Sequence, residues 1–180
     1  MNLNSDALNA WLNEHHFATP PVEFDLGAST GPVWTLQDLL ALAEPNDRQE
    51  LSHLSISYVH SRGTRALRGA IAAHASVEPD QVQVTTGAAE ALWILFLLAA
   101  EPTANVVVPQ RPSFPTFNEA PRALGVEVRS YRLRREDDYR VDVDEIGALV
   151  DGNTKRVVVN RPHNPREPWS PSRSLPRFIG

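Results

Sequence analysis

The fold is decided by the stretch Gln81-Val82-Gln83-Val84-Thr85-Thr86-Gly87-Ala88-Ala89-Glu90-Ala91-Leu92. Valine alternates with polar residues before Gly87, as in a strand, and strong helix formers follow it. Gly87 can turn the chain at positive φ, and the small Ala88 and Ala89 let backbone N–H groups of the first helical turn approach a bound phosphate. The stretch therefore predicts a strand, a turn and a helix, and the turn is either a phosphate site or a simple loop closure.

From residue 81 onward, strands and helices alternate. We expect strands at 81–86, 105–109, 126–133 and 156–160, and helices at 88–100, 114–124 and 144–151. Short apolar strands separated by helices are typical of a mostly parallel sheet that is covered on both faces, so the expected fold class is α/β, in three α/β/α layers. The helix at 88–100 is apolar almost all round, and we expect it to lie deeply buried under a large partner surface.

The residues before 81 carry weaker patterns. Short strands are expected at 22–26 and 54–58, and Thr35 with Asp38 has the spacing of a capping box at the start of a helix that Pro45-Asn46-Asp47 would stop. Thr64 is the expected N-cap of a later helix. That helix would bury a stripe of Leu67, Ala70, Ile71 and His74. The adjacent His15 and His16 point to different faces of a first helix, so we expect surface residues and no metal site.

The composition excludes several classes of protein. The 180 residues include no cysteine, which leaves no disulfide, thiolate nucleophile or zinc-thiolate site. No apolar run approaches the roughly 20 residues of a membrane span, and the first residues lack the pattern of a signal peptide, so we expect a cytoplasmic protein with no membrane contact. The net charge of −5 argues against nucleic acid as a partner. Acidic residues interrupt the arginines of 129–140, which favours a solvated edge over a nucleic-acid patch.

Four blocks, taken in order, resemble landmarks of the pyridoxal-phosphate-dependent class I/II aminotransferases, the fold-type-I family. They are Tyr58 with Gly63, Leu67-Arg68 and Ala70-Ile71-Ala72; Gly87 to Ala91; Pro112-Ser113-Phe114-Pro115; and Asn160 to Pro165, where Arg161 replaces a proline. The resemblance spans about residues 22–165, roughly the first half of a family member. The opening segment is similar to the branch that includes capreomycidine-synthase-like enzymes.

The resemblance implies a site for pyridoxal 5'-phosphate. Backbone N–H groups of Gly87, Ala88 and Ala89 would hold the cofactor phosphate, and Phe114 would stack on the pyridine ring. Asn164 would donate its amide to the ring oxygen. Tyr58 would reach the phosphate of a neighbouring subunit, which implies a homodimer, and Ser29 falls where the family's first loop passes the substrate. Without the resemblance, we would expect Phe114 to be a core residue, Asn164 to form a turn and Tyr58 to be a half-buried strand tyrosine.

The family's chemistry also needs a Schiff-base lysine, an aspartate at the pyridine nitrogen and an arginine for the substrate carboxylate, all downstream of the Asn-Pro block. The only lysine is Lys155, which precedes a strand at the wrong end and is expected to be an exposed surface residue. Arg166-Glu167 also stand where the family has Thr-Gly. We therefore expect a truncated or frame-shifted sequence.

The expected layout is an arm and the start of a small domain at 1–50, part of the cofactor-binding large domain at 51–165 and a proline-rich tail at 166–180. The function implied is an aminotransferase that moves an amino group between an amino acid and a 2-oxo acid, inactive in this chain alone. The alternative is a non-catalytic α/β module that binds a phosphorylated ligand or a partner subunit.

Overall fold

The computed structural model describes residues 33–161 together with residues 10–11, 14–15, 20, 23 and 163. These residues form two compact units, one that ends at Thr86 and one that begins at Gly87. The predicted strand at 22–26, the candidates Ser29 and Asn164, His16 and the segment 166–180 lie outside the described residues. The domain boundaries at 50 and 165 stay predictions. No helix within the described ranges is both long and apolar enough to cross a membrane.

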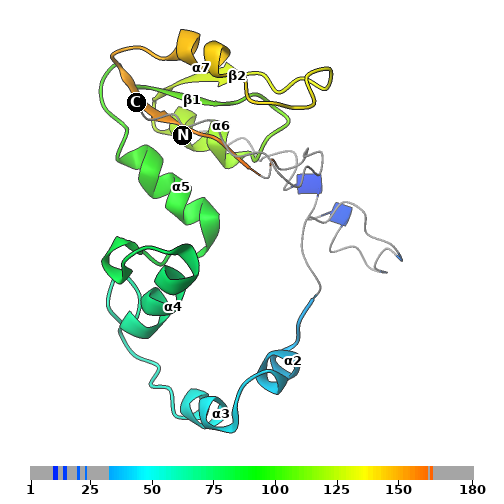
Figure 1. The fold of residues 1–180 in the computed structure, drawn as a ribbon, viewed down its shortest axis with the longest axis vertical. Coiled ribbons are helices and arrows are strands. Elements are labelled where there is room, and N and C mark those ends of the chain that lie inside the picture. The colour runs from blue at the N-terminus through cyan, green and yellow to red at the C-terminus, as the bar shows by residue number, and fades with distance from the viewer. Residues whose placement is uncertain are drawn as a thin grey trace. The chain divides into compact units, whose positions relative to one another are not determined.

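The first unit contains α2 Leu36–Ala41, α3 Pro45–Ser52, α4 Arg65–Ala75 and the 3-10 turn η1 Pro79–Gln81 (Figure 1). The capping box before α2 is confirmed: Thr35 Oγ1 accepts from the backbone N–H of Asp38 at 3.1 Å, and Asp38 Oδ2 accepts from that of Thr35 at 3.0 Å. The Asp38 carboxylate also accepts from the Thr35 hydroxyl at 2.6 Å, and this bond first and the one from the Thr35 N–H second lower the pKa of Asp38. Thr64 caps α4 as predicted, with Oγ1 accepting from the N–H of Leu67 at 3.3 Å.

One prediction for this unit is incomplete and another is wrong. The helix α2 ends before Pro45-Asn46-Asp47, as predicted, but a new helix begins there, because Pro45 occupies the first turn of α3. Proline suits that position, where the missing N–H has no intrahelical acceptor in any case. The segment 54–58 is not a strand. Its alternating pattern is local, whereas a strand also needs a partner, and no strand of the described residues pairs with it.

The buried face of α4 also differs from the prediction. The residues expected to form its buried stripe are exposed, namely Leu67, Ala70, Ile71 and His74. Arg68, only 8% exposed, is buried instead, and its guanidinium donates to the carbonyl oxygens of Pro79 at 2.9 Å and Gly63 at 3.4 Å and to Asp80 Oδ1 at 3.2 Å. The orientation of α4 therefore follows from one arginine with three acceptors, because a buried charge must be hydrogen-bonded.

Gly63 closes the turn in front of α4. It has φ of +94°, and its N–H donates to the carbonyl oxygen of His60 at 2.8 Å. A Cβ at this position would lie 2.5 Å from Cγ2 of Val84, so the turn packs directly on the segment that precedes Gly87. That segment is not the predicted strand 81–86. It follows η1 as extended chain and is tied to the turn by the N–H of Val84, which donates to the carbonyl oxygen of Arg62 at 3.1 Å.

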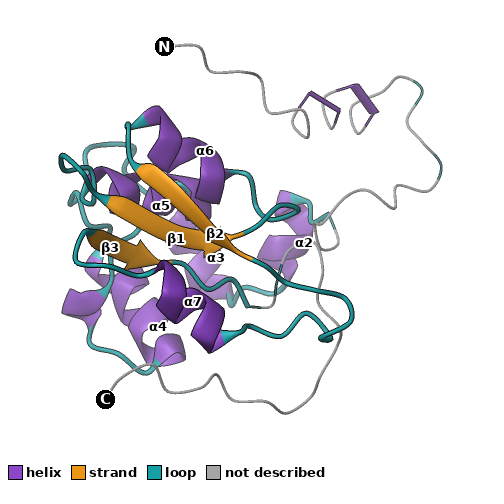
Figure 2. Ribbon diagram, turned by 90° about the horizontal axis from the view of Figure 1, so that it is seen from above, coloured by secondary structure: helices purple, strands orange, loops and turns teal. Residues whose placement is uncertain are grey.

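The second unit carries a three-stranded parallel sheet in the order β2-β1-β3 (Figure 2). Its elements are α5 Gly87–Leu97, β1 Asn105–Pro109, α6 Thr116–Ala123, β2 Glu127–Tyr131, α7 Val143–Leu149 and β3 Thr154–Val157. One face of the sheet packs Val106 and Val108 against Phe96 of α5 and Phe117 of α6. The opposite face packs Val107 and Tyr131 against Ile146 of α7. The predicted parallel α/β/α fold is confirmed, and β1 has the predicted bounds.

The burial predicted for the helix at 88–100 is wrong for most of its length. Phe96 is buried in the core, but Leu97 is 61% and Leu98 is 67% exposed. Further apolar side chains of this segment are also exposed: Trp93, Ile94 and Leu95. The sequence pattern indicated that apolar surface surrounds the helix, and the described residues cover only the side that faces α6 and the sheet.

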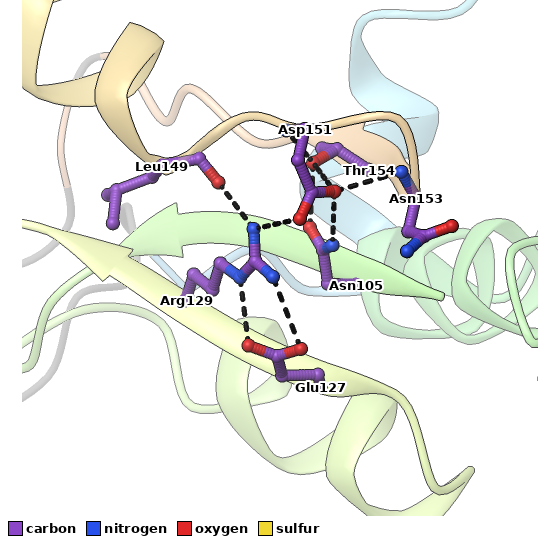
Figure 3. Close-up of polar contacts among 7 residues, drawn as sticks. All are labelled: Asn105, Glu127, Arg129, Leu149, Asp151, Asn153 and Thr154. Atoms are coloured by element: carbon purple, nitrogen blue, oxygen red, sulfur yellow. Dashed lines mark hydrogen bonds and ion pairs between the residues drawn. The ribbon is translucent and has the colours of Figure 1, made fainter. Parts of the chain in front are cut away.

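A polar network ties the amino ends of the three strands together (Figure 3). Asp151 accepts from Asn105 Nδ2 at 2.9 Å, from Arg129 Nη1 at 2.7 Å and from the N–H of Asn153 at 2.8 Å. Thr154 Oγ1 donates to Asn105 Oδ1 at 2.7 Å. The bonds from Asn105 first and Arg129 second hold the pKa of Asp151 well below its usual range. The network fixes the register of β1 with both neighbours, and no single segment of the sequence reveals it.

Candidate functional site

The topology predicts a ligand crevice at one end of the sheet. The crossover from β1 to β2 runs through α6 on one face, and the crossover from β2 to β3 runs through α7 on the other face. The two crossovers run along the sheet in opposite directions, which places a switch point between β1 and β3. In open α/β sheets, ligands bind at such a switch point, outside the carboxyl ends of the strands. The segments that follow β1 and β3 are accordingly the first place to look for a functional site.

The segment after β1 is anchored by a short relay of hydrogen bonds. Ser113 Oγ donates to the carbonyl oxygen of Pro109 at 3.2 Å, and Asn118 Nδ2 donates to Ser113 Oγ at 3.3 Å. Phe114 is half-buried and meets Phe117 edge to face, with ring centroids 5.6 Å apart. Phe114 thus packs on the core, as expected for this residue without the family resemblance. It lies in the loop that leaves the carboxyl end of β1.

The segment after β3 contains a buried side-chain amide, that of Asn160, for which the sequence predicted no binding role. Val158 is fixed by its N–H, which donates to the carbonyl oxygen of Val107 at 2.8 Å, and by its own carbonyl oxygen, which accepts from Tyr131 Oη at 3.0 Å. Two residues further on, Asn160 Nδ2 is buried and has no hydrogen-bond partner among the described residues. A buried donor left in this state costs about 1–3 kcal/mol, so such an atom is a candidate ligand donor.

Gly87 begins α5 with φ of +77°, as expected for a turn at positive φ. A Cβ at Gly87 would meet nothing within 4 Å, so the glycine is required by the backbone conformation and not by crowding. Ala88 and Ala89 are exposed. Helix geometry directs the first-turn N–H groups out of the end of the helix, and the helix dipole adds positive potential there, so this end of α5 suits an anion.

The remaining candidates are not tested at this site. Tyr58 belongs to the first unit and is fully exposed at 106%. Ser29 and Asn164 lie outside the described residues. Lys155 is predicted to be an exposed surface lysine and is half-buried instead, with Nζ 2.6 Å from Glu101 Oε2 in an ion pair. It stands near the amino end of β3, at the edge opposite the crevice. Among the described residues, no group of histidine and acidic side chains is arranged to hold a metal.

The fold and the crevice define a doubly wound α/β protein with a helix end suited to phosphate. The family model for class I and II aminotransferases matches residues 26–166. The chain belongs to that family.

Similar proteins agree with the family match. Capreomycidine synthase of Streptomyces vinaceus is 34% identical over 161 residues, which cover 88% of this chain and 40% of that protein. Bovine tyrosine aminotransferase is 31% identical over 113 residues, or 60% of this chain and 25% of that protein. The chain therefore spans well under half the length of these relatives.

Solved structures show the same fold. A PLP-dependent aminotransferase from Streptococcus suis superposes with a TM-score of 0.76 at 24% identity, over 92% of this chain and 44% of that one. Alanine aminotransferase from Pyrococcus furiosus superposes with a TM-score of 0.59 at 27% identity, over 66% of this chain and 31% of that one. The large-domain fold expected from the sequence is thus supported independently of the family model.

Proposed function

We propose that these residues supply part of the cofactor site of a pyridoxal-phosphate-dependent aminotransferase, which moves an amino group between an amino acid and a 2-oxo acid. The observation that carries the proposal is Gly87 at positive φ, opening α5 within the matched residues. When bound, pyridoxal phosphate supplies an electron sink for the bonds of the substrate's α-carbon. The residues of this chain would bind and orient it.

The donor set present fits this cofactor. Gly87, Ala88 and Ala89 offer backbone N–H groups to a phosphate. Phe114 offers a flat apolar side chain in the loop after β1, and Asn164 would donate an amide to the ring oxygen. Asn160 adds a buried amide donor at the carboxyl end of β3, a residue type that suits a polar ligand in the crevice.

The experiment is a titration with pyridoxal phosphate, followed by the change in cofactor absorbance. Ala89→Glu places a carboxylate at the helix end, where it repels the phosphate, and we expect affinity to fall about tenfold or more. Ala148→Glu is the matched control, because Ala148 is also an exposed helical alanine of the second unit. Equal affinities of the two variants would remove the helix end from the site.

We expect no turnover from these 180 residues alone. The only lysine, Lys155, is held by Glu101 at the edge away from the crevice and cannot reach a ligand there. Borohydride reduction in the presence of pyridoxal phosphate should therefore leave the Lys155 peptide unmodified by mass spectrometry. Stoichiometric labelling of Lys155, lost in Lys155→Arg, together with transamination of an amino acid, would overturn this expectation.

The competing function is a non-catalytic module that binds a phosphorylated ligand through the same Gly87 turn. Both functions need the helix end, so Ala89→Glu does not separate them. Binding of pyridoxal separates the two functions. A cofactor site that also contacts the pyridine ring retains measurable affinity for pyridoxal, which has no phosphate. A pure phosphate module binds inorganic phosphate as tightly as pyridoxal phosphate.

We also propose a homodimer in which Tyr58 of one copy reaches the cofactor phosphate of the other. The full exposure of Tyr58 supports this role, since its hydroxyl is open to a second copy. Tyr58→Phe should weaken pyridoxal phosphate binding only at concentrations where sedimentation shows a dimer. A cytoplasmic location stays a prediction of the sequence patterns alone.

A further inference from the structure

A second polar site lies beside the proposed cofactor site, on the β2 side of β1. It is an open cleft of about 590 Å³ between the loop after β1, α6 and the end of β2. Its lining residues are Gln110, Arg111, Asn118, Arg122, Ser130 and Arg132. Three of them are arginines and none is acidic, although the whole chain has a net charge of −5. None of these residues belongs to the proposed cofactor site, and we call this hollow the arginine cleft.

Arg122 is held in the cleft without being neutralised. Its Nη1 donates to the carbonyl oxygen of Asn118 at 3.3 Å and to Asn118 Oδ1 at 3.2 Å. Asn118 is itself only 2% exposed and is fixed through Ser113 to the end of β1. No carboxylate of the described residues lies within ion-pair distance of Arg122. The guanidinium is thus positioned by an amide, and its charge remains available to a ligand.

The other two arginines have carboxylate partners that stand outside the cleft. Arg111 pairs with Glu119, and Arg132 Nε lies 3.1 Å from Glu145 Oε1. Such partly exposed pairs contribute about 0–1 kcal/mol to stability. They therefore orient the two arginine side chains without using all of their hydrogen-bond donors. A guanidinium has five N–H donors, and one carboxylate uses at most two, which leaves donors for a second anion.

A smaller hollow of about 200 Å³ extends the positive surface. It shares Gln110, Arg111 and Arg132 with the arginine cleft and adds Arg134. The guanidinium of Arg134 also has carboxylate partners outside the hollow, Asp137 Oδ2 at 3.6 Å and Glu145 Oε2 at 3.9 Å. A positive, acid-free concavity favours a compact anion with several acceptor oxygens, and arginine forks match phosphate oxygens in pairs. A monocarboxylate has two oxygens and so offers fewer acceptor sites to three guanidinium groups than a phosphate does.

We propose that the arginine cleft binds a phosphate group, as inorganic phosphate or as the phosphate of a small ester. Arg122 supplies the unneutralised charge, Arg111 and Arg132 close over the remaining oxygens, and Ser130 and Gln110 supply neutral hydrogen bonds at the wall. The proposal does not depend on the aminotransferase assignment, because it uses none of the residues assigned to the cofactor.

The test is a titration of the protein with inorganic phosphate at constant ionic strength, with sodium chloride as the balancing salt, followed by NMR of the arginine side chains. Arg122→Gln should weaken phosphate binding about tenfold, since a hydrogen-bonded charge is lost. Arg122→Lys keeps the charge without the fork and should lie between. Arg140→Gln is the control, because Arg140 is exposed, lies outside the cleft and loses the same charge. Far-UV circular dichroism checks that each variant folds.

The outcomes are distinct. A loss in Arg122→Gln that Arg140→Gln does not share supports the site, whereas equal binding by both variants, or phosphate no better than chloride, overturns it. A parallel titration with pyridoxal and pyridoxal phosphate identifies the source of the phosphate. If Arg122→Gln weakens pyridoxal phosphate as much as inorganic phosphate while Ala89→Glu weakens neither, the cleft takes the cofactor phosphate and the role proposed for α5 fails. If Arg122→Gln affects inorganic phosphate alone, the cleft is a second phosphate site.

Discussion

Replacing Gly63 with alanine tests the packing of the first unit most directly. The new Cβ would stand 2.5 Å from Cγ2 and 2.8 Å from Cβ of Val84, distances that real Cβ atoms avoid. Overpacking of this kind costs about 1–3 kcal/mol, and holding a non-glycine residue at φ of +94° costs about 1–2 kcal/mol more. Alanine also restricts the unfolded chain, which offsets about 0.4–1 kcal/mol. The expected net loss of stability is about 1–5 kcal/mol.

Hydrogen–deuterium exchange of the α4 amides is the assay, since it reports the opening of this unit by itself. A loss of about 2 kcal/mol accelerates exchange roughly 30-fold. Gly69→Ala is the control within the same helix, because nothing lies within 4 Å of its new Cβ, and it should slow exchange by adding helix propensity. Val84→Ala in the Gly63→Ala background removes the closest contact and should restore part of the loss. Equal shifts for the two glycine variants would refute the reasoning.

Three further outcomes are expected. Asp151→Asn should lower the free energy of unfolding by urea at neutral pH and flatten its decline in acid. The pKa of Asp151 is held below its usual value near 4, so its contribution is present above that pH and lost as the pH falls below it. The control is Asp138→Asn, which removes an exposed carboxylate outside the network and should cost less at neutral pH than Asp151→Asn does. Burial raises the pKa of Tyr131 to about 12. Its contribution to the stability of the folded state therefore persists below pH 10 and is lost as the pH rises toward 12. A phenolate absorbance step near pH 10 from all three tyrosines would contradict this. Thr35→Ala should cost α2 about 1 kcal/mol, seen as roughly fivefold faster amide exchange confined to 36–41, and uniform change along the chain would count against the cap.

The elements that the sequence predicts well are those set by local chemistry. Thr35 and Asp38 satisfy helix-end donors three residues apart, and β1 is an apolar run that is buried on both faces. The segments 54–58 and 81–86 have strand-like alternation but no strand partner among the described residues, and pairing depends on what lies beside a segment in space. Proline is common both just after one helix and in the first turn of the next, so composition alone cannot tell whether Pro45 ends a helix or begins one.

The candidate site divides in the same way. The positive φ of Gly87 follows from a glycine between a strand-like run and helix formers. The burial of the Asn160 amide and the position of Arg122 in a cleft without acidic lining do not show in the sequence, because each depends on which side chains folding brings near. Arg68 is a similar case: periodicity predicts an apolar face for α4, and the three acceptors around its guanidinium decide otherwise.

The strand order β2-β1-β3 also bears on how the chain is made. β1 is the central strand, yet it is synthesised first, and β3, which covers its second edge, ends about fifty residues later. At roughly 5–20 residues per second, a ribosome takes about 2–10 s to complete that interval. Throughout it, Val106-Val107-Val108 carries unpaired backbone groups on at least one edge. The strand most buried in the finished sheet is therefore the one most open to wrong partners during translation.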